Sequence, residues 1–214
     1  RYDEKIRKKK KNIGRKLIKM PDTSDIMQLF WGLANGEKER INSGLELIKI
    51  LQEKQTLQAN NQWCDELSYS LKRLIRGLLS SRAGARQGFS MALVLILNTF
   101  TSTLITTKQL QSLKHSIISL SQKSNKQERK DYYFAQIFYM LVLCRTNRLN
   151  DLPAQQVLSA TSEIMKLLKE KKLMTELCTS VMIQMIQQST FNTLFKETLY
   201  PYFLTCSSEI VVAT

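Results

Sequence analysis

The sequence predicts an all-α protein, more specifically an α-solenoid of armadillo or HEAT type, in which antiparallel helices are stacked in a row. Apolar residues recur every three or four positions through most of the 214 residues, which is the period of an amphipathic helix. Nine such segments are joined by short connections, and no segment has a convincing strand pattern. Because the segments are irregularly spaced and give no clear sequence repeat, a compact orthogonal bundle is the alternative fold.

Capping signals delimit the first helix, and a second helix follows it directly. Residues 22–25, Asp-Thr-Ser-Asp, offer an N-cap, and Asn35-Gly36 ends the first helix. The second helix is expected over about residues 37–57, where apolar positions step by three or four, as in a helix packed on one side. The residues of this expected core stripe are Ile41, Leu45, Ile48 and Leu51.

The third and fourth helices are expected over about residues 63–79 and 82–98, with Ser80-Ser81 as the cap of the fourth. The fourth helix has the richer apolar face, so we expect it to contact neighbours on more than one side. Residues 99–107 are rich in Thr, but an isolated strand would have no partner, so we predict a linker. Thr106 or Thr107 then caps the next helix.

Five further helices follow this linker, over about residues 107–121, 131–145, 154–170, 172–188 and from 190 onward. The sixth helix is rich in aromatic residues and follows a predicted polar loop that contains Lys123, Lys126, Arg129 and Lys130. The apolar positions of the eighth helix, which we expect to face the core, are Leu177, Val181, Ile183, Met185 and Ile186.

Positive charge is concentrated at the N-terminus. The chain carries 32 Lys and Arg against 18 Asp and Glu, a formal net charge of +14, of which +8 falls on residues 1–19. We therefore expect a basic, at most partly ordered tail over residues 1–20, a helical-repeat domain over 21–205 and an irregular end over 206–214. The tail can act as a nuclear targeting signal, as a nonspecific nucleic-acid arm or as a solubilising end. The targeting residues would be Arg7, Lys8, Lys9, Lys10, Lys11, Arg15 and Lys16.

The residues give no support to several function classes. The longest apolar run, Met91 to Leu97, has seven residues, whereas a membrane span needs about 20, so we expect no membrane partner. The single histidine, His115, has no obvious catalytic partner, and the acidic residues are scattered. We therefore predict no enzyme activity, catalytic residue, metal or cofactor. The cysteines, which we expect to be buried reduced thiols, are Cys64, Cys144, Cys178 and Cys206.

The most specific block of the sequence lies in the third and fourth predicted helices. Residues 69–78 read Tyr-Ser-Leu-Lys-Arg-Leu-Ile-Arg-Gly-Leu, and residues 85–93 read Ala-Arg-Gln-Gly-Phe-Ser-Met-Ala-Leu. These stretches are similar to the pattern Tyr-x-Leu-Lys-Arg-Leu-x-x-Gly-Leu followed by Ala-Arg-x-Gly-Phe-x-x-Ala-Leu in the N-terminal region of the DNA polymerase phi / Myb-binding protein family. Gln87 departs from this pattern, because family members often have Leu there.

The resemblance to this family extends over about residues 26–203. Leu29–Ala34 resembles the opening helix of the family, and Gln136–Phe138 and Arg148-Leu149 resemble a helix and turn that follow it. Family members are much longer, and the first residue of this chain, Arg1, indicates a fragment. The resemblance implies a nucleolar protein of ribosomal-RNA gene transcription and ribosome biogenesis that binds transcription factors as a coregulator.

A basic patch in the most specific block is the candidate binding site. Lys72, Arg73 and Arg76 have helical spacing, and Arg82 and Arg86 lie four residues apart on the next helix, so we expect two facing basic rows. Such rows can neutralise the phosphates of DNA or RNA. The alternative is structural, with Arg stems covering the groove between helices or pairing with the acidic residues that begin the third helix.

Three functions compete on this basis. A nucleolar scaffold and transcription coregulator, with nuclear proteins such as transcription factors as partners, agrees best with the helical pattern and the resemblance. A direct, sequence-independent DNA- or RNA-binding module is the alternative. A DNA polymerase is the weakest, because it would need strands that carry paired carboxylates. The sequence leaves the identity of the partner and the oligomeric state open.

Overall fold

The computed structural model describes residues 23–58, 62–118, 125–170 and 174–188. Within these ranges it contains eight α-helices and one short 3-10 helix, and it contains no strand, which confirms the predicted all-α class. The elements are α2 (Thr23–Leu33), α3 (Glu37–Thr56), α4 (Asp65–Gly77), α5 (Ala83–Thr99), α6 (Thr107–Ile118), α7 (Lys126–Arg145), η2 (Arg148–Asp151), α8 (Ala154–Glu170) and α9 (Thr175–Ile186).

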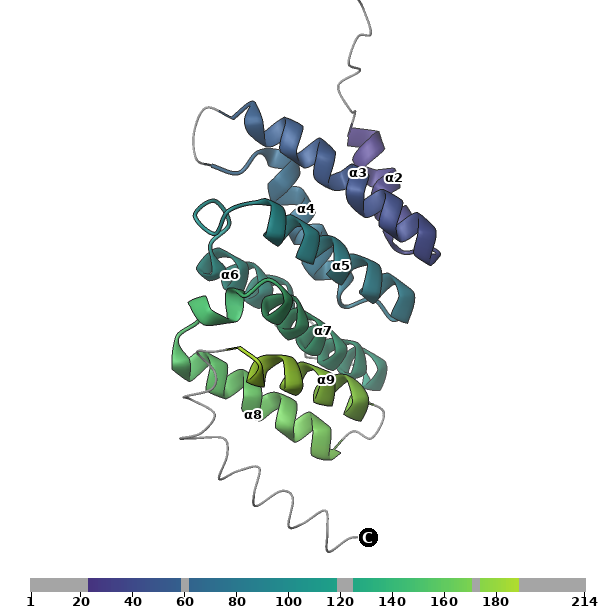
Figure 1. The fold of residues 1–214 in the computed structure, drawn as a ribbon. Helices are drawn as coiled ribbons and strands as arrows, with labels where there is room; N and C mark the ends of the chain where they lie inside the picture. The colour runs from purple at the N-terminus through teal and green to yellow at the C-terminus, as the bar shows by residue number, and fades with distance from the viewer. Residues whose placement is uncertain (1–22, 59–61, 119–124, 171–173, 189–214) are drawn as a thin grey trace, which may run out of the picture.

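Consecutive helices pair, and the pairs follow one another along the molecule (Figure 1). The pairs are α2 with α3, α4 with α5, α6 with α7 and α8 with α9. Helices α3, α5, α7 and α9 lie side by side in one row, each in contact with the next. On the other side, α4 packs on α6, whereas α6 and α8 make no comparable contact. The described helices share one hydrophobic core.

Helix α5 is central to this packing. It contacts α2, α3, α4 and α7, which confirms that the fourth predicted helix packs on more than one side.

The predicted helix caps are confirmed only in part. Thr106 caps α6 as predicted, because the Gln109 N–H donates to Thr106 Oγ1 (3.3 Å) and the Thr106 N–H donates back to Gln109 Oε1 (2.9 Å). The predicted serine cap of α5 is wrong: the N-cap position is Arg82, with no side-chain cap bond.

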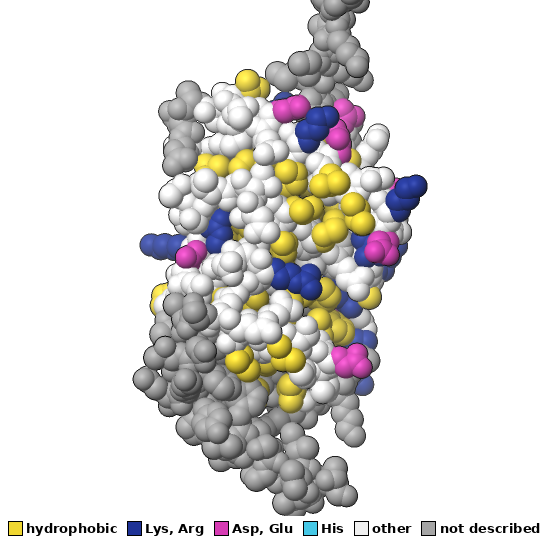
Figure 2. All heavy atoms as spheres, viewed as in Figure 1, with side chains coloured by type: hydrophobic (Ala, Val, Ile, Leu, Met, Phe, Trp, Pro, Cys, Tyr) yellow, Lys and Arg dark blue, Asp and Glu magenta, His cyan; other side chains and the backbone are white. Residues whose placement is uncertain are grey.

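Helix α3 buries a different face from the one its apolar pattern predicts. Ile41 and Leu45 are exposed, at 44% and 57% of their full accessible surface, so the predicted core stripe is wrong at these positions. Figure 2 shows hydrophobic side chains gathered over α3 and α5 on this face of the molecule. The prediction fails because small residues of α3, rather than its large apolar ones, face the neighbouring helices and let them approach closely. The face that α3 buries consists of Ser43, Gly44, Leu47, Ile50 and Leu51.

Two further sequence predictions need correction. Helix α7 begins at Lys126 and not near 131, because the Asn125 side chain caps it by accepting from the Gln127 and Glu128 N–H groups (3.0 Å each). The predicted loop residues 126, 129 and 130 are therefore helical, while Lys123 lies outside the described residues. Ile183 of α9, predicted to face the core, is 51% exposed. The basic tail, the last predicted helix and the irregular end lie outside the described residues.

Among the described helices, none has both the length and the apolar character required to span a membrane.

Candidate interaction surface

The basic residues of α4 lie on its outer face together with an aromatic residue. Lys72 and Arg76 are exposed, Arg73 is half-buried, and Tyr69 is 42% exposed. Positions 69, 72, 73 and 76 are separated by three, one and three residues, so they share one side of the helix. The opposite side of α4 supplies its buried residues, which are Leu67, Ser70, Leu71, Leu74 and Ile75.

Helix α2 extends this surface with two exposed hydrophobic side chains. Trp31 is 68% exposed and Met27, one turn earlier, is 39% exposed. Tyr69 joins the two helices: its hydroxyl donates to Met27 Sδ (3.0 Å), and its ring meets Phe30 edge to face, with 5.9 Å between centroids. We call this surface the aromatic-basic face, which comprises Met27, Trp31, Tyr69, Lys72, Arg73 and Arg76.

Sequence reasoning did not place Met27 and Trp31 in a site. The exposure of these two residues could have been predicted from their positions, because Ile26, Phe30 and Leu33 form the buried stripe of α2. Positions 27 and 31 fall outside that stripe, on an adjoining side of the helix, where a large apolar residue does not enter the core.

Arg82 lies between the start of α5 and the end of α2. It is the N-cap residue of α5 and is exposed, and its Nη2 donates to the Ala34 carbonyl at the end of α2 (3.1 Å). This bond ties the start of α5 to the end of α2. Arg82 therefore remains a surface cation close to the helices that form the aromatic-basic face.

Arg86 does not form the predicted second basic row, because it is only 5% exposed. Its Nη1 donates to the Ser80 carbonyl and lies 3.7 Å from Asp131 Oδ1. Its guanidinium carbon is 4.2 Å from the centre of the Phe134 ring, a cation–π contact. Burial lowers the pKa of Arg86, and the charge of Asp131 partly offsets this effect. This burial favours the structural alternative for Arg86 over contact with phosphate.

Two glycines of the most specific block, Gly77 and Gly88, lie where helices pack closely together. A methyl group on Gly77 would overlap the Phe89 ring, and one on Gly88 would overlap the Leu33 carbonyl group. Only a residue without a side chain lets α4 and α2 approach α5 this closely. The block therefore places the basic residues of α4 at the surface and holds α5 in the centre.

Arg148, in the Arg148-Leu149 segment that also resembles the family, is a second buried cation and is likewise 5% exposed. It donates to the carbonyls of Leu97 (3.2 Å), Phe100 (3.2 Å) and Ile105 (2.7 Å). These carbonyls lie at the end of α5 and in the linker that follows it, so Arg148 fixes the path of the chain into α6. Burial lowers the pKa of Arg148, and Asp151 partly offsets this effect.

The described cysteines confirm the expected buried thiols. Cys64, Cys144 and Cys178 are free and buried, whereas Cys206 lies outside the described residues. Burial raises the pKa of Cys144 to about 12 and that of Cys178 to about 11, so both are protonated near neutral pH. Across the described ranges, no group of three or more His, Cys, Asp or Glu side chains is arranged to hold a metal ion.

Comparison with known proteins agrees with the resemblance of the most specific block. The chain is 28% identical over 180 residues to a Myb-binding protein 1A-like protein of Danio rerio, a match that covers 81% of this chain and 13% of the relative. It is 36% identical over 118 residues to the rDNA transcriptional regulator pol5 of Schizosaccharomyces pombe, which covers 54% of this chain and 11% of the relative. The chain thus matches only a small part of either relative's length, and no solved structure matches it. The model of the DNA polymerase phi family matches residues 69–208, so the chain belongs to that family.

Proposed function

We propose that the chain is an armadillo- or HEAT-like solenoid segment that acts as a nucleolar scaffold and coregulator of rDNA transcription and ribosome biogenesis. Its partner on the aromatic-basic face would be a transcription factor. The row of paired helices supports the solenoid. The names of the two relatives, a Myb-binding protein and an rDNA transcriptional regulator, support the functional context.

The observation that carries this proposal is an exposed tryptophan on α2 together with exposed cations on α4, two helices that Tyr69 joins. Trp31 is 68% exposed, and the exposed Lys72 and Arg76 of α4 form no ion pair with any other described residue. Trp, Tyr and Arg are the side chains that most often dominate the energy of a protein interface. An acidic amphipathic segment of a transcription factor would bury the aromatic side chains and neutralise the cations.

We also propose that the chain is not an enzyme, although its family is named after a polymerase. Nucleotide polymerisation needs carboxylates that converge on two metal ions. Two of the acidic side chains in the described structure instead pair with cations: Glu66 with Lys54 (3.2 Å) and Asp131 with Arg86. Incorporation of nucleotides by the purified chain with Mg²⁺ or Mn²⁺ would contradict this proposal.

Direct, sequence-independent binding of DNA or RNA is the second candidate function. It is favoured by the exposed cations at 72, 76 and 82, and by the basic tail, residues 1–20, which we propose as a nuclear targeting segment and a further nucleic-acid arm. Arg86 does not take part in this alternative, because it is buried.

A cellular experiment tests the coregulator proposal. Cells that express the chain as Trp31→Ala should show less of it on rDNA chromatin, measured by chromatin immunoprecipitation, and less nascent ribosomal RNA. The matched control is Trp63→Phe, because Trp63 is half-buried, lies outside both α2 and α4, and donates from Nε1 to the Leu104 carbonyl (2.7 Å). Normal rDNA occupancy of Trp31→Ala, at equal protein abundance, would contradict the assignment of this face.

A further inference from the structure

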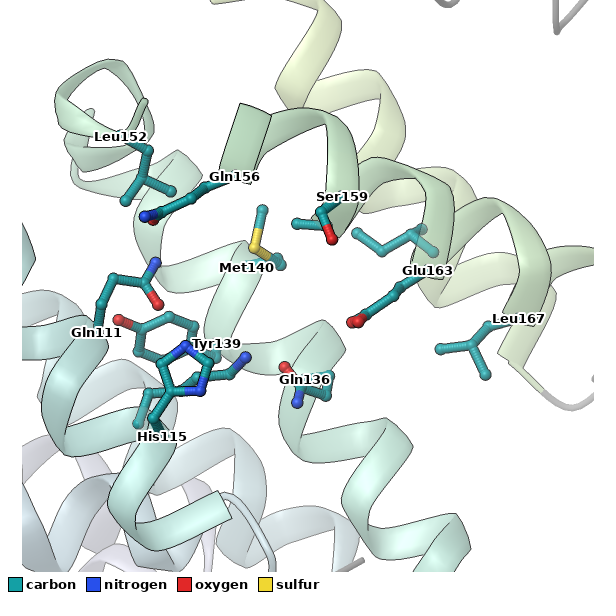
Figure 3. Close-up of a pocket in the computed structure, with 13 residues that line it drawn as sticks. Gln111, His115, Gln136, Tyr139, Met140, Leu152, Gln156, Ser159, Glu163 and Leu167 are labelled. Atoms are coloured by element: carbon teal, nitrogen blue, oxygen red, sulfur yellow. The ribbon is translucent and has the colours of Figure 1, made fainter. Parts of the chain in front are cut away.

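A polar pocket lies where two neighbouring helices of the molecule separate. Helices α6 and α8 form its walls and α7 forms its floor (Figure 3). Its volume is about 210 Å³. The pocket is distant in sequence from the aromatic-basic face, which belongs to α2 and α4.

The floor of the pocket contains a buried hydroxyl group without a partner. Tyr139 is 1% exposed, and its hydroxyl oxygen has no hydrogen-bond partner among the residues that the structure describes. Figure 3 shows this hydroxyl beside the side chain of Gln111, at the edge of the pocket. A buried hydroxyl without a hydrogen bond destabilises a fold, so a bound group that pairs with it would recover that energy. Met140, also buried, supplies the apolar part of the floor.

The charged residues of the pocket balance each other. Lys114 on α6 is half-buried and Glu163 on α8 is exposed. Burial lowers the pKa of Lys114, and the charge of Glu163 opposes this shift. A phosphate group would approach Glu163 unfavourably, and a cationic side chain would approach Lys114 unfavourably. The pocket therefore suits an uncharged polar ligand.

Three carboxamides face the pocket, one from each of its helices: Gln111 from α6, Gln136 from α7 and Gln156 from α8. The Gln136 Nε2 donates to the Tyr132 hydroxyl (2.8 Å), which fixes the orientation of its carbonyl oxygen. A carboxamide offers both a donor and an acceptor, and a peptide group offers the same pair. Side chains of this type bind backbone amides without regard to sequence.

We propose that this pocket binds an extended peptide segment of a protein partner through its backbone amide groups, one of which pairs with the Tyr139 hydroxyl. The proposal rests on the scaffold function, because it adds a second contact site for a partner protein. The ligand class is an uncharged peptide segment with small side chains, since only these leave room for the backbone in a pocket of about 210 Å³.

Nuclear magnetic resonance of the full chain tests this proposal. With ¹³C-methyl-labelled methionine, the Met140 signal, assigned with Met140→Leu, reports on the pocket. The probe is dialanine capped by an acetyl group and an N-methylamide, which carries peptide groups and no charge. We expect a saturable shift of the Met140 signal. Tyr139→Phe should weaken binding about fivefold, as loss of one hydrogen bond predicts, and should not unfold the protein.

The control variant is Tyr133→Phe, which removes a hydroxyl from the same helix at a residue that does not line the pocket, and it should bind as the wild type does. Equal affinity of Tyr139→Phe and wild type, or no Met140 shift with capped dialanine, would overturn the proposal. Tighter binding of free glycine or inorganic phosphate would also overturn it, because the ligand would then be an ion. This titration contains no transcription factor. A negative result would therefore contradict the peptide site without contradicting the scaffold function.

Discussion

At the scale of single residues, two buried arginines connect parts of the chain that are far apart in sequence. Arg86 links α5 to the Ser80 carbonyl and to Asp131 and Phe134 of α7, and Arg148 holds the linker between α5 and α6. The sequence predicted Arg86 as a surface cation, because its four-residue spacing from Arg82 does not reveal which side of α5 is covered. Burial depends on α7, which lies about 45 residues further along the chain.

The role of Arg148 leads to a stability prediction. Arg148→Met keeps an apolar stem of similar length but leaves three carbonyl groups without their donors. We expect the free energy of unfolding to fall by about 3 kcal/mol, because charged hydrogen bonds are lost from a buried position.

Urea denaturation measures this difference. Arg145→Met is the matched control, because Arg145 lies three residues earlier and is exposed, so it should change stability by less than about 0.5 kcal/mol. Equal effects of the two substitutions would show that Arg148 does not hold the linker.

At the scale of elements, the helices could be predicted from the sequence, but their buried faces could not always be. The range predicted for α8 agrees with the structure and that for α5 differs by one residue at each end, because apolar period and caps are local properties. The buried face of α3 was mispredicted because Ser43 and Gly44 pack, while the larger Ile41 and Leu45 do not. Contact between helices is a tertiary property, and large apolar residues are an imperfect guide to it.

Close contact between α2 and α5 gives a prediction at this scale. Gly88→Ala should lower the free energy of unfolding by about 2 to 3 kcal/mol, because the added methyl group overlaps the Leu33 carbonyl and pushes the helices apart.

Gly84→Ala on the same helix is the control for this prediction. A methyl group at Gly84 would meet only Arg40 Nη2, at 3.9 Å, so the higher helix propensity of Ala should stabilise the protein by about 0.5 kcal/mol. Thermal unfolding of the two variants should move the melting temperature in opposite directions. A shift in the same direction for both would refute the packing role of Gly88.

At the scale of the whole molecule, the fold presents one aromatic-basic face at the α2 and α4 end and a polar pocket at the α6 and α8 end. The basic part of the face could be predicted, since Lys72, Arg73 and Arg76 share helical spacing in the sequence. Its aromatic part required the contact between Tyr69 and α2, which joins residues 42 positions apart. The pocket required three helices to be placed in space, and no local pattern indicates it.

The most direct test of the account is the affinity of the purified full chain for a Myb-family transcription factor, measured by isothermal titration calorimetry. We predict that Trp31→Ala and Lys72→Glu/Arg76→Glu each weaken binding by about tenfold or more, as expected for interface hot spots. Lys108→Glu/Arg145→Glu, the same charge change at exposed positions on α6 and α7, should leave it unchanged. If only the charge reversals reduce binding and duplex DNA binds more tightly than the transcription factor, with a steep salt dependence, the face is a nucleic-acid site. That result would contradict the scaffold account.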